Sequence, residues 1–428
     1  MSSYNELCQY PPILHNPSPQ PVFMLGRRPP LPMQYLGSKY RIGERILTQI
    51  SGKCSEQKRF VDLCSGTGTV ALAAADSGYE IICNDLQPYS AAILKSMFVE
   101  PTACIDDLLQ SLNGLDGDKH LLGKGRQFLA ESLAEESSYF EKFEGNDWPW
   151  EKYAKFCNEI EISRGDEVDD GKYDLFSKYY PNTYFGVRQC LEIDFLREYA
   201  DSCTSPAKAH VLAATISAMT YAVSSTTHLA QYLKPKNQSS VEGLYKRRKI
   251  VIIDLVIQGL ERLSEMKNRP IAEVVHQMDY LEALDILNLG PDDVVYVDPP
   301  YFKEHYSRYY HVLDTFYLYD YPELTFNSRI DDVTVGRYRK ERLISDFGKK
   351  SRVRGAFNNI FEKISQSGST LALSYAQTSL VSQEELISMA ALLGLRLISH
   401  EGFLIMHSGQ GQPRNQQVED YLLLFRRN

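Results

Sequence analysis

Cysteine pairs at metal-binding spacing are missing from this sequence of 428 residues. Its eight cysteines form no Cys-x-x-Cys pair, and none is grouped with histidines at the spacing of metal ligands. This absence argues against a zinc site, and it favours reduced thiols over a disulfide framework. We therefore predict a protein without a bound metal.

The sequence also lacks segments that would direct it to a membrane. Residues 1–21 are polar and rich in proline, without the cationic start and apolar core of a signal peptide. No uninterrupted apolar run approaches the roughly 20 residues that a bilayer-spanning helix requires. We expect a soluble cytoplasmic protein that has no membrane partner.

An overall excess of basic residues is absent as well. Asp and Glu number 55 against 46 Lys and Arg, which gives a formal net charge of -9. This balance excludes a protein that coats nucleic acid by total charge, although it leaves room for a local basic cleft. With 43% hydrophobic residues, a chain of this length can bury a full core and form more than one domain.

The clearest functional pattern is Val-Val-Tyr-Val-Asp-Pro-Pro-Tyr at residues 294–301. Its first four residues are apolar at every position, which is typical of a buried parallel strand. The two prolines end that strand because they lack the amide hydrogen that a sheet requires. We therefore expect Asp298 and Tyr301 at the carboxyl end of a strand, where open α/β sheets bind their ligands.

A second strand end is predicted near the N-terminus, at residues 60–71. There an apolar strand meets a glycine-rich turn and then a strong helix former. Gly66 and Gly68 would let the backbone approach a ligand without a Cβ atom between them. A further strand over residues 79–83 leads to Asp85, which is placed to accept hydrogen bonds from a ribose. Both a dinucleotide and S-adenosylmethionine carry such a ribose, so this pattern leaves both open.

The regular alternation of strands and helices stops near residue 99 and resumes near residue 271, a gap far longer than an ordinary crossover. We predict a flexible N-terminal arm over residues 1–30 and an α/β catalytic domain built from residues 31–99 and 271–428. Residues 100–270 would form a large, mainly helical inserted recognition domain, of which residues 100–170 are an acidic lobe. The chain is expected to end in an antiparallel hairpin, residues 403–407 with 418–425, at the sheet edge.

Basic residues interleaved with aromatic and amide side chains occur within the insertion and after residue 301. Such mixtures provide what a groove needs to hold phosphates and read base edges. For residues 246–249, a solvated charged helix face is an equally good interpretation. Residues 302–319 favour a mobile loop that covers a substrate. The predicted DNA contacts are Lys234, Lys236, Arg247, Arg248 and Arg308.

The strand end at residue 298 suits a reaction on an aromatic amine. Such an amine is a poor nucleophile because its lone pair is delocalised into the ring. Asp298 and the Pro299 carbonyl could accept its two N–H bonds and draw the nitrogen toward tetrahedral geometry. Pro299 and Pro300 would hold both acceptors rigid, and Tyr301 could stack on the ring. This is the chemistry of methyl transfer to an adenine amine.

The order of these motifs resembles that of the Dam-like, alpha-group DNA adenine-N6 methyltransferases. In that family an N-terminal cofactor motif and a glycine-rich motif precede a recognition insertion and Asp-Pro-Pro-Tyr. Here residues 35–39 (Tyr-Leu-Gly-Ser-Lys) match the first motif, residues 62–68 the second and residues 298–301 the last. Residues 414–423 also resemble the end of such enzymes. The likeness covers residues 31–99 and 271–426.

This resemblance implies a Rossmann-like methyltransferase sheet, S-adenosylmethionine as cofactor and double-stranded DNA as partner, with the target adenine flipped out of the stack. A cognate restriction endonuclease is a further candidate partner. The implied catalytic residues are Asp298, Pro299, Pro300 and Tyr301. The implied cofactor-binding residues are Tyr35, Lys39, Asp62, Gly66, Gly68, Asp85, Asp279 and Tyr280.

Three other functions compete with this interpretation. An NAD-type dehydrogenase fits Gly66-x-Gly68-x-x-Ala71 and Asp85, but it leaves Asp-Pro-Pro-Tyr unexplained. An RNA adenine-N6 methyltransferase would use the same catalytic strand end. A catalytically silent nucleic-acid-binding relative is disfavoured by the presence of both Asp85 and Asp298.

Overall fold

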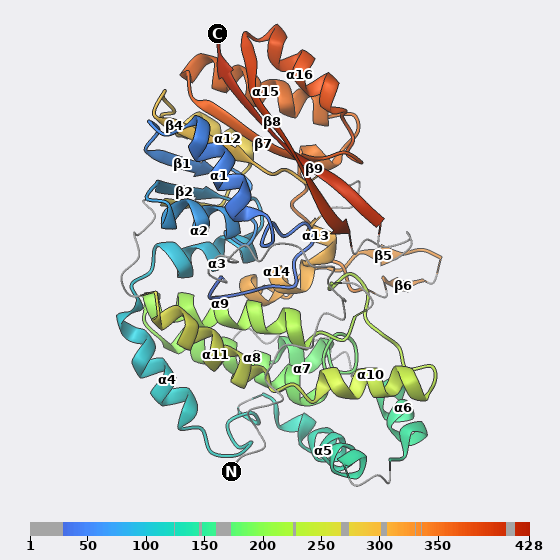
Figure 1. Ribbon diagram of the computed structural model, residues 1–428. Coiled ribbons are helices and arrows are strands. Elements are labelled where there is room, and N and C mark those ends of the chain that lie inside the picture. Colours follow the sequence, from blue (N-terminus) through green and yellow to red (C-terminus); the bar gives the residue numbers. More distant parts are fainter. Residues whose placement is uncertain are drawn as a thin grey trace, which may run out of the picture.

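The protein forms two joined halves, one built on a sheet and one built of helices (Figure 1). The computed structural model describes residues 29–123, 125–144, 148–159, 173–225, 228–266, 274–300, 306–329, 331–334, 336–407 and 416–428. The flexible arm predicted for residues 1–30 lies almost wholly outside this part of the chain. Pro29 and Pro30, its last two residues, are buried.

Within the described residues the main sheet has seven strands in the order β3-β2-β1-β4-β7-β9-β8. Neighbouring strands from β3 to β7 run parallel, whereas β9 is antiparallel to both β7 and β8. The architecture is therefore mixed α/β with a mostly parallel central sheet, as predicted. The strands are β1 (Arg59–Asp62), β2 (Glu80–Asn84), β3 (Val274–His276), β4 (Asp293–Val297), β7 (Thr370–Ala376), β8 (Leu395–His407) and β9 (Gln416–Arg427).

The strand order reverses beside β1. From β1 the chain moves outward through β2 to β3, and it then returns to the other side of β1 with β4. Asp62, the last residue of β1, pairs with Tyr296 of β4, so these two strands end side by side. Such a reversal opens a crevice outside the carboxyl ends of the strands, which is where open α/β sheets bind ligands.

Both faces of β4 are buried, which explains its continuous apolar sequence. Val294 and Tyr296 belong to a first apolar cluster, whereas Val295 and Val297 belong to a second one on the opposite face. On the sheet side, the helices that contribute to the first are α1 (Gly43–Lys53), α2 (Thr69–Asp76) and α3 (Pro88–Phe98). Those that contribute to the second are α12 (Tyr280–Ile286), α15 (Val353–Ser367) and α16 (Gln383–Leu392).

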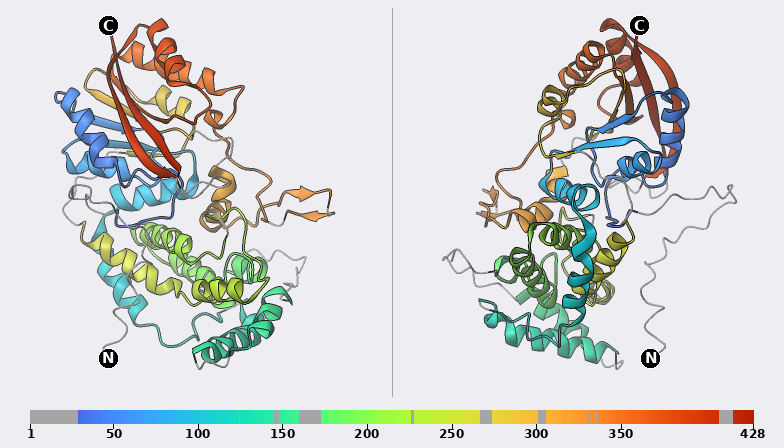
Figure 2. Two further views of the ribbon diagram at one scale, coloured as in Figure 1. Left: turned by 45° about the vertical axis from the view of Figure 1, so that its right-hand side comes forward. Right: turned by 90° about the vertical axis from the view of Figure 1, so that its left-hand side faces the viewer.

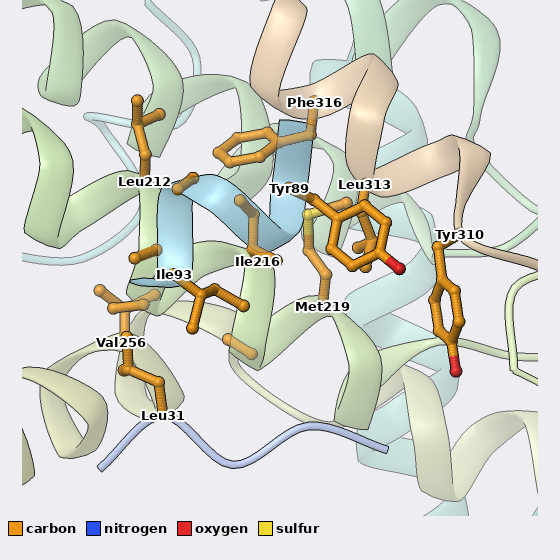
Figure 3. Close-up of a cluster of buried hydrophobic side chains, with 14 of the residues drawn as sticks. Leu31, Tyr89, Ile93, Leu212, Ile216, Met219, Val256, Tyr310, Leu313 and Phe316 are labelled. Atoms are coloured by element: carbon orange, nitrogen blue, oxygen red, sulfur yellow. The ribbon is translucent and has the colours of Figure 1, made fainter. Parts of the chain in front are cut away.

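The first apolar cluster continues from the sheet into the helical half. Figure 3 shows Ile93 of α3, Ile216 and Met219 of α9 (Ser205–Ala222) and Phe316 of α14 (His311–Leu318) together in this cluster. The two halves therefore share one core. The helices between β2 and β3 that follow α3 are α4 (Ile105–Asn113), α5 (Ala130–Glu144), α6 (Trp150–Glu159), α7 (Leu175–Tyr179), α8 (Val187–Ser202), α9 (Ser205–Ala222), α10 (Gln238–Arg248) and α11 (Ile252–Ser264), with the 3-10 turns η1 (Thr102–Cys104) and η2 (Gln127–Leu129).

The prediction of a mobile loop at residues 302–319 is wrong for its described part. Residues 306–318 form two short helices, α13 (Tyr306–Tyr309) and α14 (His311–Leu318). Tyr310 and Phe316 are completely buried, so these aromatic residues fill the shared core. The part at residues 302–305 lies outside the described residues.

The C-terminal strands also differ from the prediction. The strand expected at residues 403–407 is the second part of a longer strand, β8, which begins at Leu395 and has a register irregularity between Leu397 and Ser399. A small ribbon of β5 (Phe326–Asn327) and β6 (Asp332–Val333) projects from the body, as Figure 2 shows, and η3 (Asp346–Gly348) precedes α15. None of the helices in the described ranges has the length and apolar character that a membrane crossing requires.

Candidate active site

A cavity lies at the carboxyl ends of the four parallel strands around the order reversal. Each of these strands leads to an acidic residue: Asp62 ends β1, and Asp85, Asp279 and Asp298 follow β2, β3 and β4. All four residues line the cavity. Residues that are more than two hundred positions apart in the sequence therefore meet at the place that the strand order defines.

The glycine-rich turn after β1 forms one wall and needs its glycines for two reasons. Gly66 and Gly68 have positive φ angles of 53° and 71°, which other residues rarely adopt. A Cβ atom on Gly66 would also lie 3.1 Å from the Tyr35 ring, and one on Gly68 would lie 2.7 Å from Leu94. Gly66 lines the cavity, whereas Gly68 is not among its lining residues and packs against α3.

Asp85 ties this turn to the end of β2. One carboxylate oxygen accepts a hydrogen bond from the Gly66 amide at 2.7 Å, and the other accepts one from the Gln87 amide at 2.8 Å. Burial raises the pKa of Asp85, and these amide donors oppose that rise. Because each carboxylate oxygen can accept more than one hydrogen bond, Asp85 retains capacity for a ligand hydroxyl.

Asp62 is the most deeply buried acidic residue of the cavity, with 1% of its surface exposed. Its Oδ1 atom has no hydrogen-bond partner among the described residues. Burial, together with the negative charges of Asp298 and Asp85, raises the pKa of Asp62 well above its usual range. An unsatisfied buried carboxyl oxygen is costly, so this wall suits a ligand that brings a hydrogen-bond donor or a positive charge.

Lys39 supplies a positive charge next to Asp298. Its Nζ lies 2.9 Å from Oδ1 of Asp298 and 3.3 Å from Oδ2 of Asp420, and only 3% of its side chain is exposed. Burial by itself would lower the pKa of Lys39, but the charges of Asp298 and Asp420 outweigh burial and raise it. The lysine therefore stays protonated and stabilises the ionised form of Asp298.

Aromatic side chains close the cavity near Tyr35. The Tyr35 ring stacks on Tyr310 at 5.1 Å and lies 5.3 Å from Tyr306. The Leu36 amide donates to the Tyr310 hydroxyl at 2.7 Å, and the Tyr306 hydroxyl donates to the Leu36 carbonyl at 2.9 Å. Tyr306 of α13 and Tyr310, the residue before α14, thus hold the N-terminal motif in place.

A second aromatic wall lies beyond β3. Tyr280 faces Phe347 at 4.8 Å between ring centres, and its hydroxyl accepts a hydrogen bond from Asn359 at 3.2 Å. The Asp279 carboxylate caps α12 by accepting a hydrogen bond from the Leu281 amide at 3.0 Å. Two flat side chains beside a carboxylate are suited to a planar ring that carries an amine.

Most of the predicted catalytic and cofactor-binding residues meet at this cavity. Pro299 is buried and is not among the lining residues, and Tyr301 lies outside the described residues. The predicted residues that line the cavity are Tyr35, Lys39, Asp62, Gly66, Asp85, Asp279, Tyr280, Asp298 and Pro300. Lining residues that the prediction missed include Asn84, Gln87, Met278, Tyr306, Leu343, Ser345 and Phe347, none of which belongs to a recognisable motif.

The predicted DNA contacts divide into exposed and buried residues. Lys234, Lys236 and Arg308 are exposed, and the Arg308 guanidinium lies 5.4 Å from the Tyr338 ring centre. Arg247 is partly buried and donates to the Tyr221 carbonyl at 3.1 Å. Arg248 is completely buried, so the prediction that it contacts DNA is wrong. The helical turn of α10 points its side chain into the protein, where no phosphate can reach it.

The strand-order reversal, the glycine-rich turn and the acidic strand ends around one cavity fit a methyltransferase-type α/β enzyme. Residues 35–387 match the D12 class N6 adenine-specific DNA methyltransferase family, and the chain therefore belongs to this family. This membership confirms the predicted enzyme class and disfavours a dehydrogenase.

The chain is also similar to proteins that are named as type II methyltransferases. The chain is 24% identical to the type II methyltransferase M.FokI of Planomicrobium okeanokoites over 85% of this chain and 47% of that protein, so it spans about half of that relative. It is 23% identical to the type II methyltransferase M.CviAII of Paramecium bursaria Chlorella virus 1 over 91% of this chain and 96% of that protein. It is 24% identical to the type II methyltransferase M.NlaIII of Neisseria lactamica over 67% of this chain and 70% of that protein.

Proposed function

We propose that this protein transfers a methyl group from S-adenosylmethionine to the N6 amine of adenine within a specific sequence of double-stranded DNA. The observation that carries the proposal is the position of Asp298. It follows β4 directly, lines the same cavity as the glycine-rich turn and is paired with the buried Lys39. A fixed hydrogen-bond acceptor thus lies next to a pocket of nucleoside-binding character.

The chemistry of the cavity fits this cofactor. When bound, S-adenosylmethionine supplies an electrophilic methyl group on a positively charged sulfur. Asp62, with its unsatisfied Oδ1, would accept from the cofactor's ammonium, and Asp85 would accept from its ribose hydroxyls. Asp279 would accept from the amine of its adenine ring, which Tyr280 and Phe347 would flank.

The target amine would be activated without proton abstraction. Asp298 and the Pro299 carbonyl would accept its two N–H bonds, and the proline pair would restrict both acceptors. Lys39 would keep Asp298 ionised. Tyr301, which lies outside the described residues, would stack on the target ring. An adenine can reach such a site only after it has left the base stack, so the reaction requires base flipping.

The helical half would recognise the DNA sequence. The motif order places it between the glycine-rich turn and Asp298, as in the alpha-group enzymes that the sequence resembles, and residues 100–270 are the proposed recognition domain. Its exposed Lys234 and Lys236 are proposed phosphate contacts. A cognate restriction endonuclease is proposed as a functional partner, because the relatives are type II methyltransferases.

The test is an assay of the full chain with isotope-labelled S-adenosylmethionine and matched substrates. Duplex DNA, single-stranded DNA and duplex RNA of the same sequence are compared, and digested nucleosides are separated by mass spectrometry. We expect the label in N6-methyladenine from duplex DNA. A label confined to RNA, or carried by cytosine, contradicts the proposal, and an absence of turnover on a pool of all short sequences identifies a silent relative.

A further inference from the structure

Asp420 is a buried carboxylate next to the active site to which no motif assigns a role. It lies on β9, opposite Ala376 of β7, and 4% of its surface is exposed. It is beyond residues 35–387, which the family match covers, and it is not among the residues that line the cavity. A substrate in the cavity therefore has no direct access to it.

The contact of Asp420 is with Lys39. The lysine Nζ lies between two carboxylates, 3.3 Å from Asp420 and 2.9 Å from Asp298. The side chains of Lys39 and Asp420 are only 3% and 6% exposed, whereas that of Asp298 is 16% exposed. Lys39 is thus the most buried of the three groups, and of its two carboxylates Asp420 is the less exposed and Asp298 is the one that lines the cavity.

This arrangement fixes both the place and the charge of Lys39. A flexible lysine that is held by one carboxylate can follow that carboxylate when it moves, but a lysine held from two sides cannot. Two negative charges also divide the attraction of one ammonium, so Asp298 is held without being fully neutralised. An acceptor that has to attract the N–H bonds of an amine benefits from both effects.

We infer that Asp420 is a positioning residue for methyl transfer, which anchors Lys39 from the antiparallel strand β9 and thereby orients Asp298 toward the target amine. The inference rests on the proposed function of Asp298. Asp420 itself touches neither the cofactor nor the adenine. The antiparallel pair of strands thus contributes to catalysis as well as to the sheet.

The test compares Asp420→Asn with Glu419→Gln in the full-length protein. Both variants exchange one carboxylate of β9 for an amide, but Glu419 is exposed. We expect kcat of Asp420→Asn to fall about 10- to 100-fold, as for other small displacements of a catalytic group, while KM for DNA changes little. Glu419→Gln keeps the wild-type kcat. Asp420→Glu, which preserves the charge, recovers part of the activity.

The split between kcat and KM and the recovery in Asp420→Glu separate positioning from simple structural damage. An anchoring carboxylate predicts a lower kcat at an unchanged melting temperature, because the fold is kept while Lys39 and Asp298 lose their fixed positions. A loss of activity that accompanies a lower melting temperature, without recovery in Asp420→Glu, overturns the inference. So does a wild-type kcat in Asp420→Asn.

A second measurement does not depend on catalysis. Acetic anhydride modifies only the neutral amine, so the pH dependence of Lys39 labelling, followed by peptide mass spectrometry, reports its pKa. We expect labelling of Lys39 at lower pH in Asp420→Asn than in the wild type or in Glu419→Gln. If this shift is found but Asp298→Ala retains turnover, the proposed function of Asp298 fails although Asp420 does anchor Lys39. If labelling is unchanged, the anchoring itself is refuted.

Discussion

Two buried cations, one in each half of the protein, have different surroundings. Lys39 in the sheet half and Arg248 in the helical half are both almost inaccessible to solvent. Lys39 and its partner Asp298 line the cavity. Arg248 lies away from the cavity and donates to Oδ1 of Asn182 at 2.6 Å and to the Cys157 sulfur at 2.9 Å. A buried charge therefore indicates a functional site here only where it borders a cavity.

The network around Arg248 connects helices to one another. Burial by itself would lower the pKa of Arg248, but Cys157, Tyr153 and Glu136 raise it overall. The Glu136 carboxylate of α5 in turn accepts from the Val187 and Arg188 amides at the start of α8, at 3.1 Å and 2.9 Å. Loss of Arg248 should therefore affect folding, and loss of Asp298 should affect catalysis.

The largest expected effect is that of Asp298→Ala on turnover. The variant lacks the carboxylate acceptor, so we expect kcat to fall at least about 10²-fold, toward the detection limit. The affinity for S-adenosylmethionine, measured by calorimetry, should change little, because Asp298 acts on the target amine. Wild-type turnover in this variant would refute the catalytic assignment.

Arg248→Ala should produce the largest loss of stability. Removal of the guanidinium leaves a cavity, deprives Oδ1 of Asn182 of its donor and weakens the electrostatic compensation of Glu136, and we expect a loss of about 3–5 kcal/mol in the free energy of unfolding. Chemical denaturation measures it, and Arg247→Ala, which changes the partly buried neighbour, serves as control. Weaker DNA binding at unchanged stability would restore the original prediction for Arg248.

Asp85→Ala should weaken cofactor binding. Its carboxylate accepts hydrogen bonds from the Gly66 and Gln87 amides and faces the proposed ribose site. A hydrogen bond to a charged group contributes about 1.5–3 kcal/mol to binding. We expect the dissociation constant for S-adenosylmethionine, measured by calorimetry, to rise roughly 10- to 100-fold. Asp85→Asn, which retains one carbonyl acceptor, should lie between this variant and the wild type. An undiminished affinity in Asp85→Ala contradicts the ribose assignment.

Asp314 offers a test that depends on pH, at the junction of the two halves. Burial raises its pKa from 3.8 to about 7, and its Oδ1 accepts from the Tyr89 amide at 3.3 Å. The folded state binds this proton more tightly than the unfolded state does, so protonation of Asp314 stabilises the fold at low pH. This contribution to the free energy of unfolding is lost as the pH rises from about 4 through 7.

The permanently neutral Asp314→Asn should therefore be more stable than the wild type at pH 8, by on the order of 1–3 kcal/mol, with a smaller gain at pH 5.5. Urea denaturation at the two pH values measures the difference. An equal effect at both pH values would show that ionisation of Asp314 is not involved.

The smallest effect is expected from Lys234→Ala combined with Lys236→Ala. If both lysines contact phosphates, the variant releases fewer counterions on binding, and the slope of log affinity against log salt should decrease by up to about 2. Arg354→Ala is the matched control, because Arg354 is exposed but paired with Glu385 at 2.5 Å. An unchanged slope would exclude these lysines from the DNA surface.

The sequence by itself determined the features that depend on neighbouring residues. A strand buried on both faces has to be apolar throughout, which made residues 294–297 recognisable. The turn at Gly66 and Gly68 requires positive φ angles, which residues other than glycine rarely adopt. Since parallel strands present their carboxyl ends at one edge, the glycine-rich turn, Asp85 and Asp298 could be placed at one crevice before their contacts were known.

Only the tertiary structure decided which charged and aromatic side chains are buried and which of them reach the cavity. Arg248 and Arg308 both occur in the sequence among polar and aromatic neighbours, yet the first is buried and the second is exposed. Phe347 reaches the cavity and Asp420 reaches Lys39 through contacts between segments that are distant in the chain. Burial and electrostatic pairing of this kind arise when distant elements pack together, so local periodicity carries no record of them.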